Sequence, residues 1–447
     1  MKKPASIRQL ALDCLLQLED DEVSISAILD NKIEAAKLHP SDRSLLNTLV
    51  YGVTRWRKRL DWVLDSFMPS HFRLDASTRN LLRIGAYQLL FLDRIPSYAA
   101  INETVALARG VKTTRFVNAV LRAVQRDADT LTYPTLESQP AQHISITQSF
   151  PLWLVERWLK RHGRRWTLAF CRACNEVAPL SLRVNTLKTS RETFAASLKS
   201  AGFAPELSPS APDGLRVPET SSPQLLPGYP DGWFYVQDES AMLVSHLLGP
   251  LPGERIIDLC AAPGGKTTHI AQQMQNRGEI FAVDASQQKL RRIRHNCHRL
   301  GITNVRFIDG DATGPIGALP DKADRVLLDA PCSGLGTLRR HPDVRWKKSE
   351  SQIEELTTVQ LALLRQAAKK VKPGGVLVYS TCSTEPEENS EIVSRFLKEH
   401  AGFVTENVGQ FLSSIPVSAV TPEGFLQTFP HEHGVDGAFA ARLRARD

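Results

Sequence analysis

Two cysteines of this chain lie in turns of small and polar residues, each directly after a predicted strand. Cys332 belongs to the motif Asp-Ala-Pro-Cys-Ser, and Cys382 belongs to the motif Thr-Cys-Ser. A free cysteine is most often a small buried hydrophobic residue, an interpretation that suits Cys14 and Cys297 but not these two. A thiolate in such a turn, beside a ligand crevice, indicates nucleophilic catalysis.

A glycine-containing turn precedes both cysteines in the chain. Its motif Cys-Ala-Ala-Pro-Gly-Gly-Lys-Thr has Cys260 where a phosphate-binding loop needs glycine, six positions before the lysine. It also lacks the G-x-G-x-x-G spacing of a dinucleotide fingerprint. What remains is a turn that opens a helix, whose N-terminal amides point into the ligand crevice. We expect Gly264 and Gly265 to leave room for a ligand beside the backbone.

Acidic residues end the next two predicted strands. Asp284 follows Gly265 by nineteen residues, the place for a carboxylate that accepts hydrogen bonds from both hydroxyls of a ribose. The following strand ends in Asp309-Gly-Asp311, which could hold an adenine edge. Any one of these acids could be a helix cap or a turn residue. However, the two acidic strand ends and the glycine-containing turn before them all have residues suited to the same ligand. They predict a site for an adenosine ligand without a triphosphate, with S-adenosylmethionine as the cofactor.

A thiolate beside a methyl donor suits methylation of a pyrimidine at carbon-5, which is too weakly nucleophilic to react unaided. Thiolate addition at carbon-6 gives an enamine that can attack the sulfonium methyl. Loss of the carbon-5 proton and elimination of the thiol complete the cycle. Asp329 fits as the group that pairs with the protonated N3 and the amino edge of cytosine, because uracil presents the opposite donor and acceptor there.

The elements that must position these residues alternate between strand and helix after Gln237. We predict strands at 255–259, 279–283, 305–308, 325–328 and 375–379, and helices at 267–274, 287–300 and 353–371. This alternation predicts a mostly parallel, doubly wound α/β sheet. Ligands of such sheets bind outside the carboxyl ends of the strands, where the cysteines and acids lie.

The N-terminal part of the chain differs, because apolar residues recur there at helical spacing. Helices are predicted at 7–18, from Ser41-Asp42 to Leu64, and at 81–92, 99–109 and 115–124. The polar stretch 127–148 predicts a linker; a helix at 150–170 follows, then short strands at 180–184, 215–217 and 233–236 around a helix at 193–201. We therefore predict an all-α domain (1–135), a small α+β domain (145–236) and a catalytic domain (237–447).

Composition limits the class of protein. Of 447 residues, 42% are hydrophobic, which excludes a largely disordered chain, and the net charge of +7 permits a nucleic-acid partner. No apolar run approaches the roughly 18 residues of a membrane span, and no secretion signal opens the chain. An odd number of cysteines, seven, fits reduced thiols and a cytoplasmic location. The pair Cys171 and Cys174 has no second pair nearby, so we expect no metal.

A basic stretch in the N-terminal part has two interpretations. Arg55, Arg57, Lys58 and Arg59 surround Trp56. Composition favours a solvated helix end whose tryptophan packs inward. The alternative is a surface that contacts RNA.

The motifs together resemble those of the RNA cytosine-5 methyltransferases of the Sun/Fmu family. Asp-Ala-Pro-Cys-Ser, Thr-Cys-Ser and Cys-Ala-Ala-Pro-Gly-Gly-Lys-Thr carry the likeness, and the start of the chain, with Tyr51-Gly-Val and Ala100-Ile-Asn-Glu-Thr-Val105, is similar to the NusB-type domain of the RsmB branch. The resemblance covers essentially the whole chain. It implies an S-adenosylmethionine-dependent enzyme that methylates a cytosine of 16S rRNA, either free or in an early small-subunit assembly intermediate.

The resemblance also implies roles for individual residues. Cys382 would be the nucleophile and Cys332 would assist release of the methylated product. The cofactor site would contain Cys260, Ala261, Ala262, Pro263, Gly264, Gly265, Lys266, Asp284, Asp311 and Asp329. The arginines of Leu338–Trp346 would suit RNA phosphates. One departure from the family pattern, Asp436-Gly-Ala-Phe439, leaves the packing of the last strand open.

Two other functions remain open at this point. One is a NusB-like RNA-binding or antitermination factor with an inactive enzyme fold, against which the intact pair of cysteines argues. The other is a DNA cytosine methyltransferase, which shares the chemistry. Such an enzyme normally places its nucleophile in the Pro-Cys motif and has a separate DNA-recognition domain, which the sequence does not show.

Overall fold

The computed structural model describes residues 6–20, 23–69, 73–218 and 222–447. The chain divides into two compact units. The first contains the chain up to Glu176 and also Leu338–Lys347, and the second contains Val177–Thr337 and Lys348–Asp447. None of the helices in the described ranges is both long and apolar enough to cross a membrane.

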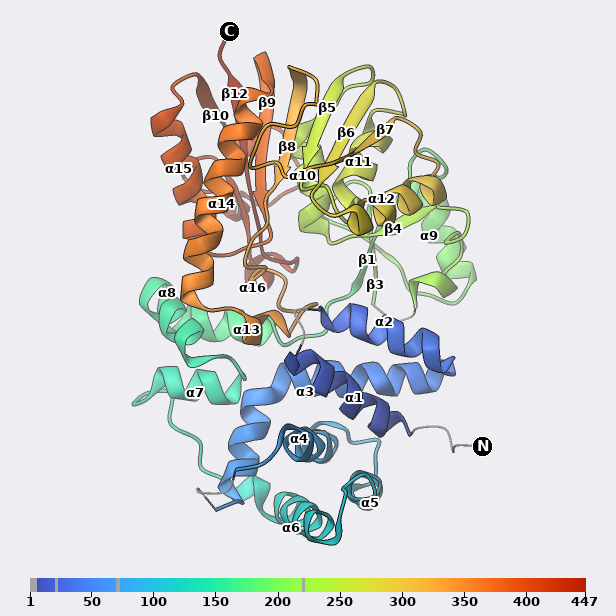
Figure 1. The fold of residues 1–447 in the computed structure, drawn as a ribbon, viewed down its shortest axis with the longest axis vertical. Helices are drawn as coiled ribbons and strands as arrows, with labels where there is room; N and C mark the ends of the chain where they lie inside the picture. Colours follow the sequence, from blue (N-terminus) through green and yellow to red (C-terminus); the bar gives the residue numbers. More distant parts are fainter. Residues whose placement is uncertain (1–5, 21–22, 70–72, 219–221) are drawn as a thin grey trace. The chain divides into compact units, whose positions relative to one another are not determined.

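The first unit is helical, as predicted. Its helices (Figure 1) are α1 (Ile7–Asp20), α2 (Ile25–Ala36), α3 (Pro40–Ser66), α4 (Ala76–Phe91), α5 (Ser97–Val105), α6 (Val111–Asp127), α7 (Pro140–Thr147), α8 (Leu152–Ala173) and α13 (Val344–Lys347). The apolar faces of α1 to α6 form one buried core. Where α3 meets α4, a Cβ at Gly52 would lie 2.0 Å from the ring of Tyr87, so only glycine permits this approach.

Two helices of this unit differ from the prediction. α2 was not predicted, although Ser24 caps it by accepting from the Ala27 amide. α7 falls inside the stretch predicted as a linker, where Pro140 occupies the first turn and Ile144 is buried. α7 is short and has few apolar residues, so its periodicity is weak in the sequence. α2 has Ile25, Ile28, Leu29 and Ile33 at helical spacing, a signal that the sequence-based prediction missed.

The second unit begins with a small antiparallel sheet in the order β2-β3-β1-β4. Its strands are β1 (Leu180–Val184), β2 (Glu206–Leu207), β3 (Gly214–Val217) and β4 (Phe234–Val236), and helix α9 (Arg191–Ser200) covers it. Leu182, Phe194, Leu198 and Phe234 share its core. The α+β character was predicted correctly.

The main sheet has the order β10-β12-β9-β8-β5-β6-β7, with β11 beside β12. Strands β5 (Arg255–Leu259), β6 (Glu279–Asp284), β7 (Val305–Asp309), β8 (Ala323–Asp329) and β9 (Val371–Thr381) are parallel, whereas β10 (Phe403–Glu406), β11 (Leu426–Thr428) and β12 (Ala438–Ala445) are antiparallel. The strand order reverses at β5, because β6 and β8 lie on its two sides. In sheets of this kind the ligand crevice lies at that reversal.

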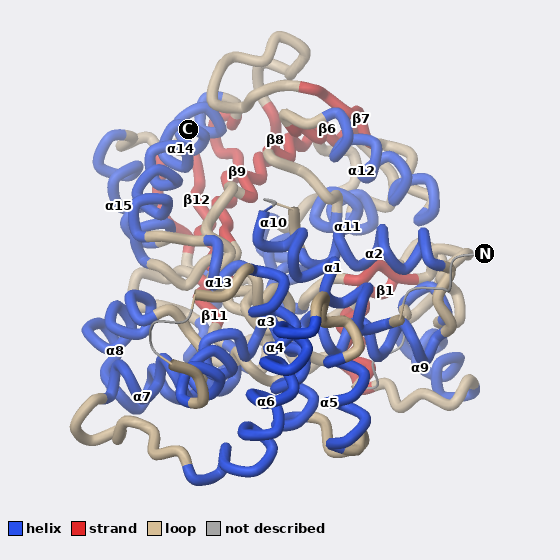
Figure 2. Tube along the Cα trace, turned by 60° about the horizontal axis from the view of Figure 1, so that its bottom comes forward, coloured by secondary structure: helices blue, strands red, loops and turns tan. Residues whose placement is uncertain are grey.

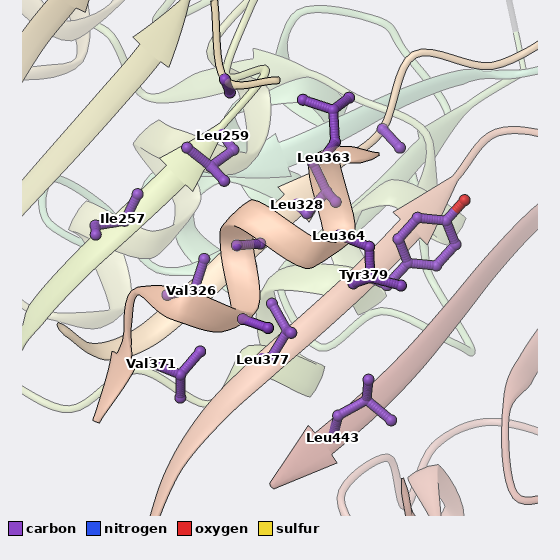
Figure 3. Close-up of a cluster of buried hydrophobic side chains, with 14 of the residues drawn as sticks. Ile257, Leu259, Val326, Leu328, Leu363, Leu364, Val371, Leu377, Tyr379 and Leu443 are labelled. Atoms are coloured by element: carbon purple, nitrogen blue, oxygen red, sulfur yellow. The ribbon is translucent and has the colours of Figure 1, made fainter. Parts of the chain in front are cut away.

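Helices cover both faces of this sheet, as the alternation of elements predicts. One face packs against α14 (Glu350–Lys369) and α15 (Ser390–Glu399), and the other against α10 (Glu239–Leu248), α11 (Gly265–Gln273) and α12 (Gln287–Leu300). The side chains of Leu328, Leu364 and Tyr379 gather between α14 and the strands (Figure 3). Successive strand residues point to opposite faces, so Ile256 and Ile257 belong to different cores.

Candidate active site

The predicted cofactor loop joins β5 to α11 at the point where the strand order reverses. Cys260 turns the chain with a positive φ of 60°, and the Ala261 amide donates to the carbonyl of Val283 at 2.9 Å. The loop thus stays at the carboxyl edge of β5 and β6. The first amides of α11 have no acceptor within the helix, so they are available to a ligand.

The two glycines of this loop allow close packing of neighbouring elements, and the expectation that they leave room for a ligand stays a prediction. A Cβ at Gly264, where φ is 96°, would lie 2.8 Å from Ile293 of α12. A Cβ at Gly265 would lie 3.2 Å from the ring of Tyr235. The glycines therefore let α12 and β4 approach the loop.

A buried arginine, which sequence reasoning missed, holds the start of α11. Arg183 of β1 is 1% exposed and donates to the Gly265 carbonyl at 2.5 Å and to Thr268 Oγ1 at 2.8 Å. Burial lowers its pKa to about 10. In the sequence Arg183 stands in an alternating strand and has no signal of its own. The small sheet thereby positions the cofactor loop.

Asp284 lies at the end of β6, as predicted. Its Oδ2 accepts from the Ala262 amide at 3.2 Å, and its Oδ1 accepts from the Ser286 amide at 3.1 Å. Each carboxylate oxygen can accept a second hydrogen bond, so the group can also bind hydroxyls. Asp311 lies beyond β7 and is exposed; its hydrogen bond from the Thr313 amide lowers its pKa.

Asp329 and Lys266 form an ion pair at the end of β8. Lys266 Nζ lies 2.6 Å from Asp329 Oδ2, and Ser380 Oγ donates to Asp329 Oδ1 at 2.9 Å. Burial alone would lower the pKa of Lys266, but the charge of Asp329 raises it above the ordinary value. The pairing of these two residues was not predicted, because 63 residues separate them.

A second buried acid lies behind the loop. Asp258 is 0% exposed, and its Oδ2 accepts from Thr267 Oγ1 at 2.6 Å. Burial raises its pKa to about 7. Asp258 also lies close enough to Lys266, Asp284 and Asp329 to interact with their charges.

The two predicted catalytic cysteines lie side by side, 50 residues apart in the sequence. Their Sγ atoms are 3.2 Å apart, and the Cys382 amide donates to Cys332 Sγ at 3.3 Å. Cys382 is exposed and Cys332 is half-buried. The hydrogen bond with Cys382, together with burial, raises the pKa of Cys332 well above its ordinary value.

Glu388, which sequence reasoning also missed, joins the two cysteine loops from behind. It is 0% exposed and accepts from the Ser333 amide at 2.7 Å and from the hydroxyls of Ser333 and Ser383 at 2.5 Å each. Gln360 of α14 donates to it at 3.0 Å. The serine that follows each cysteine is thus bound to the same carboxylate, which fixes one loop against the other.

A pair of glycines completes this arrangement. The Gly336 amide donates to the Cys382 carbonyl at 2.9 Å, and the Gly437 amide donates to the Gly336 carbonyl at 2.8 Å. A Cβ at Gly336 would lie 1.9 Å from the Gly437 carbonyl oxygen. The chain departs from the family pattern at Ala438, which is buried like Phe439 beside it, and β12 pairs with β9 over residues 439–444. The last strand is therefore well packed despite this difference from the family pattern.

Arg345, one of the arginines expected to contact RNA, is used inside the first unit, which corrects the expectation for this residue. Arg345 is 0% exposed, lies 3.9 Å from the centre of the Phe150 ring and donates to Asn175 Oδ1 at 2.9 Å. Burial lowers its pKa to about 9. Arg55 donates to the Arg339 carbonyl at 2.8 Å.

The basic stretch around Trp56 shows the same pattern. Arg57 lies 3.9 Å from Glu19 in an ion pair, and Arg59 lies over the rings of Trp56 and Phe91. Of the four basic residues in this stretch, only Lys58 is exposed. The stretch is therefore mainly structural.

Three side chains of the second unit could supply metal ligands. The ligand atoms of Asp213, His246 and His269 lie within 4.8 Å of one another, and they form the one such group in the described part of the chain. Asp213 Oδ2 lies 2.8 Å from His269 Nε2 and 3.0 Å from His246 Nε2. Since the carboxylate already pairs with both rings, we interpret the cluster as a link between the turn before β3 and helices α10 and α11.

Comparison with known proteins agrees with this architecture. The family model for the 16S rRNA methyltransferase RsmB/F matches residues 245–444, the NusB family model matches residues 5–126, and the ferredoxin-like domain of RsmF/B-like methyltransferases matches residues 150–222. The crystal structure of PH0851 superposes with a TM-score of 0.82 at 28% identity, covering 99% of each chain. NSun6 from Pyrococcus horikoshii, solved with SFG, has a TM-score of 0.61 at 28% identity and covers 67% of this chain and 99% of its own.

Curated relatives match over their full length. The probable ribosomal RNA small subunit methyltransferase B of Synechocystis sp. is 38% identical over 446 residues, which cover 98% of this chain and 99% of the relative. Ribosomal RNA small subunit methyltransferase B of Cronobacter sakazakii is 36% identical, with 99% of each chain covered. The chain therefore belongs to the RsmB/F family of ribosomal RNA small subunit methyltransferases.

Proposed function

We propose that this protein transfers a methyl group from S-adenosylmethionine to carbon-5 of a cytosine in 16S rRNA, in the cytoplasm, through a covalent adduct between a cysteine and carbon-6. The observation that carries the proposal is the pair of thiols. The Sγ atoms of Cys332 and Cys382 are 3.2 Å apart at neighbouring strand ends. Methyl transfer to a more nucleophilic position of RNA would need neither thiol.

The donor site that we propose is the loop Cys260–Lys266 with Asp284 and Asp311. The loop amides and the free acceptor capacity of Asp284 suit a ribose and its neighbouring groups. One structural neighbour, NSun6, was solved with SFG, an analogue of S-adenosylmethionine. When bound, the donor supplies an electrophilic methyl group on its sulfonium sulfur.

We assign the addition step to Cys382, because its thiol is exposed and Cys332 is half-buried. Its thiolate forms a bond to carbon-6 while N3 of the ring takes a proton from solvent, which leaves a neutral enamine able to attack a methyl group from carbon-5. Asp329 is placed to accept hydrogen bonds from the protonated N3 and the amino group. Lys266 Nζ, at 2.6 Å, pairs with the Asp329 carboxylate and holds it in position for this task.

We assign assistance in the release step to Cys332. After methylation, carbon-5 holds both a proton and the new methyl group. A water molecule acting as base removes that proton, the electron pair restores the 5,6 double bond, and the bond between carbon-6 and Cys382 Sγ breaks to return a thiolate. N3 then returns its proton to solvent, which leaves neutral 5-methylcytosine. Cys332 Sγ, next to Cys382 Sγ, can give the leaving thiolate a hydrogen bond and so stabilise its charge.

The experiment that tests the function uses the full chain with a labelled methyl donor and three samples: a 16S rRNA transcript, double-stranded DNA, or no nucleic acid. We expect label only in the rRNA, and nucleoside digestion followed by mass spectrometry should identify it as 5-methylcytidine. A different methylated nucleoside would overturn the proposal.

Binding of rRNA without any methyl transfer would favour the alternative of a NusB-like factor, and transfer to DNA would favour a DNA enzyme. Both an untreated 16S rRNA transcript and a partly assembled small subunit should be tried, because either could be the substrate.

A further inference from the structure

Helix α12 has an exposed face that is strongly basic. Its cations Lys289, Arg291, Arg292 and Arg294 are exposed, as are His295 and His298. Residues 285–300 contain no aspartate or glutamate. Arg291, Arg294, His295 and His298 follow the i, i+3, i+4, i+7 spacing that places side chains on one side of a helix. We call Lys289, Arg291, Arg292, Arg294, His295 and His298 the α12 basic face.

The opposite face of the same helix does the packing. Leu290, Ile293, Cys297 and Leu300 are buried, and Ile293 lies against Gly264 of the cofactor loop. Asn296 Nδ2 donates to the Pro263 carbonyl at 3.2 Å. Figure 2 shows α12 beside β7 at one edge of the main sheet. The fold therefore needs the apolar face of α12 but does not explain the basic one.

The charges of this face are not neutralised within the protein. In the described parts of the chain, no ion pair involves Lys289, Arg291 or Arg292. By contrast, the exposed Arg306 and the half-buried Arg365 of the same unit are both paired. Arg306 lies in an ion pair with Glu279, and Arg365 lies 2.7 Å from Glu399. Like charges three and four residues apart destabilise a helix. A polyanionic partner would remove that repulsion.

We propose that the α12 basic face binds phosphates of the RNA substrate. The inference rests on the proposed function for its substrate and adds a binding surface to it. α12 starts three residues after Asp284 at the carboxyl edge of the sheet, so the basic face begins beside the donor site and leads away from it. Arginines in an exposed row suit a chain of phosphates, which they can bind bidentately without reading sequence.

The test compares two double variants of the full chain that lose the same charge. R291Q/R292Q removes two unpaired cations of the α12 basic face, and R306Q/R365Q removes two cations that are already paired with carboxylates. Affinity for a 16S rRNA transcript is measured from about 50 to 200 mM salt. The affinity falls as salt rises, and each lost phosphate contact makes the plot of log affinity against log salt less steep by about 0.7 to 0.9. We expect R291Q/R292Q to make this plot less steep by about 1.5 and to weaken the affinity about tenfold. We expect R306Q/R365Q to change neither the steepness nor the affinity.

Calorimetry with S-adenosylmethionine checks that the cofactor loop is intact, since both variants should bind it as the unaltered protein does. An unchanged slope for R291Q/R292Q, or an equal loss in R306Q/R365Q, would overturn the inference. Loss of affinity without a change of slope would also overturn it, because phosphate contacts must alter the slope. The outcome for the proposed function is separate: a protein that binds rRNA through α12 but yields no 5-methylcytidine would refute the chemistry and leave this surface in place.

Discussion

The two cysteine loops are built alike but expose their thiols differently. Each follows the carboxyl end of a parallel strand, and in each the next serine donates to Glu388. Cys382 is exposed, whereas Cys332 is half-buried and has a raised pKa. One scaffold therefore leaves one thiol exposed and keeps another protonated beside it. The difference indicates two distinct roles rather than two interchangeable nucleophiles.

Replacing Cys382 by alanine should have the largest effect. Without the exposed thiol no bond to carbon-6 can form, so we expect methylation to fall by about 10⁴-fold or more, as when a covalent nucleophile is removed. The measurement is methyl transfer to 16S rRNA, with calorimetry of donor binding as a control for folding. Substantial turnover by the variant would show that the exposed thiol is not the nucleophile.

Replacing Cys332 by alanine should stall the reaction after the bond to carbon-6 has formed. We expect turnover to fall by about 10- to 100-fold, because a hydrogen bond to a charged group contributes about 1.5–3 kcal/mol. A covalent protein–RNA adduct that survives denaturing electrophoresis should accumulate. The double variant should behave like Cys382→Ala and form none. An adduct in Cys382→Ala but not in Cys332→Ala would reverse the roles, and the Pro-Cys thiol would then be the nucleophile, as in DNA cytosine methyltransferases.

Replacing Glu388 by glutamine should loosen one loop relative to the other. The glutamine side chain has one acceptor oxygen instead of two, so it cannot accept from all the groups that now donate to Glu388. A buried donor left without an acceptor costs about 1–3 kcal/mol of unfolding free energy. We expect that loss in denaturant unfolding. In protein that remains folded, adduct formation and release should both slow by about tenfold, an effect that lost stability alone would not produce. Glu391→Gln, on the exposed start of α15, is the control. If adduct formation and release had equal rates in the two variants, Glu388 would have no role in positioning the cysteine loops.

The smallest expected effect concerns alkylation. In the unaltered protein at pH 8, iodoacetamide should modify Cys382 faster than Cys332, by about tenfold, since only the thiolate reacts and burial hinders access. The raised pKa of Cys332 means that it stays a thiol as the pH rises through the ordinary range for cysteine. Peptide mass spectrometry over time gives both rates. Equal rates would show that the asymmetry of the two loops does not extend to their chemistry.

Local motifs made much of this site predictable. The strand 255–259 and the helix 287–300 agree with β5 and α12, since buried strands and amphipathic helices are visible in a short window. The cysteine turns and Asp284 were placed at strand ends for the same reason. The structure brings them to one edge of the sheet, although their chemical roles remain proposals.

What the sequence could not show depends on distant partners. Glu388 follows Pro-Glu, as in an exposed first turn of a helix, and its burial depends on Ser333, 55 residues earlier. Arg345 stands in a segment whose composition favours a basic surface, yet it packs on Phe150. No pattern within a helix or strand contains such information, because the environment is built from residues far apart in the chain.

The place of Arg345 has a consequence for the order in which the protein forms during translation. Its guanidinium occupies a site lined by the carbonyls of Ser149 and Cys174 and by the Asn175 side chain. A ribosome makes those groups long before it reaches residue 345. The helical unit therefore leaves the exit tunnel with an unfilled polar gap, which closes only after most of the methyltransferase sheet has been synthesised. An isolated fragment that ends at Glu176 would keep that gap permanently, so helical-unit fragments should include the 338–347 segment, fused or added as a peptide.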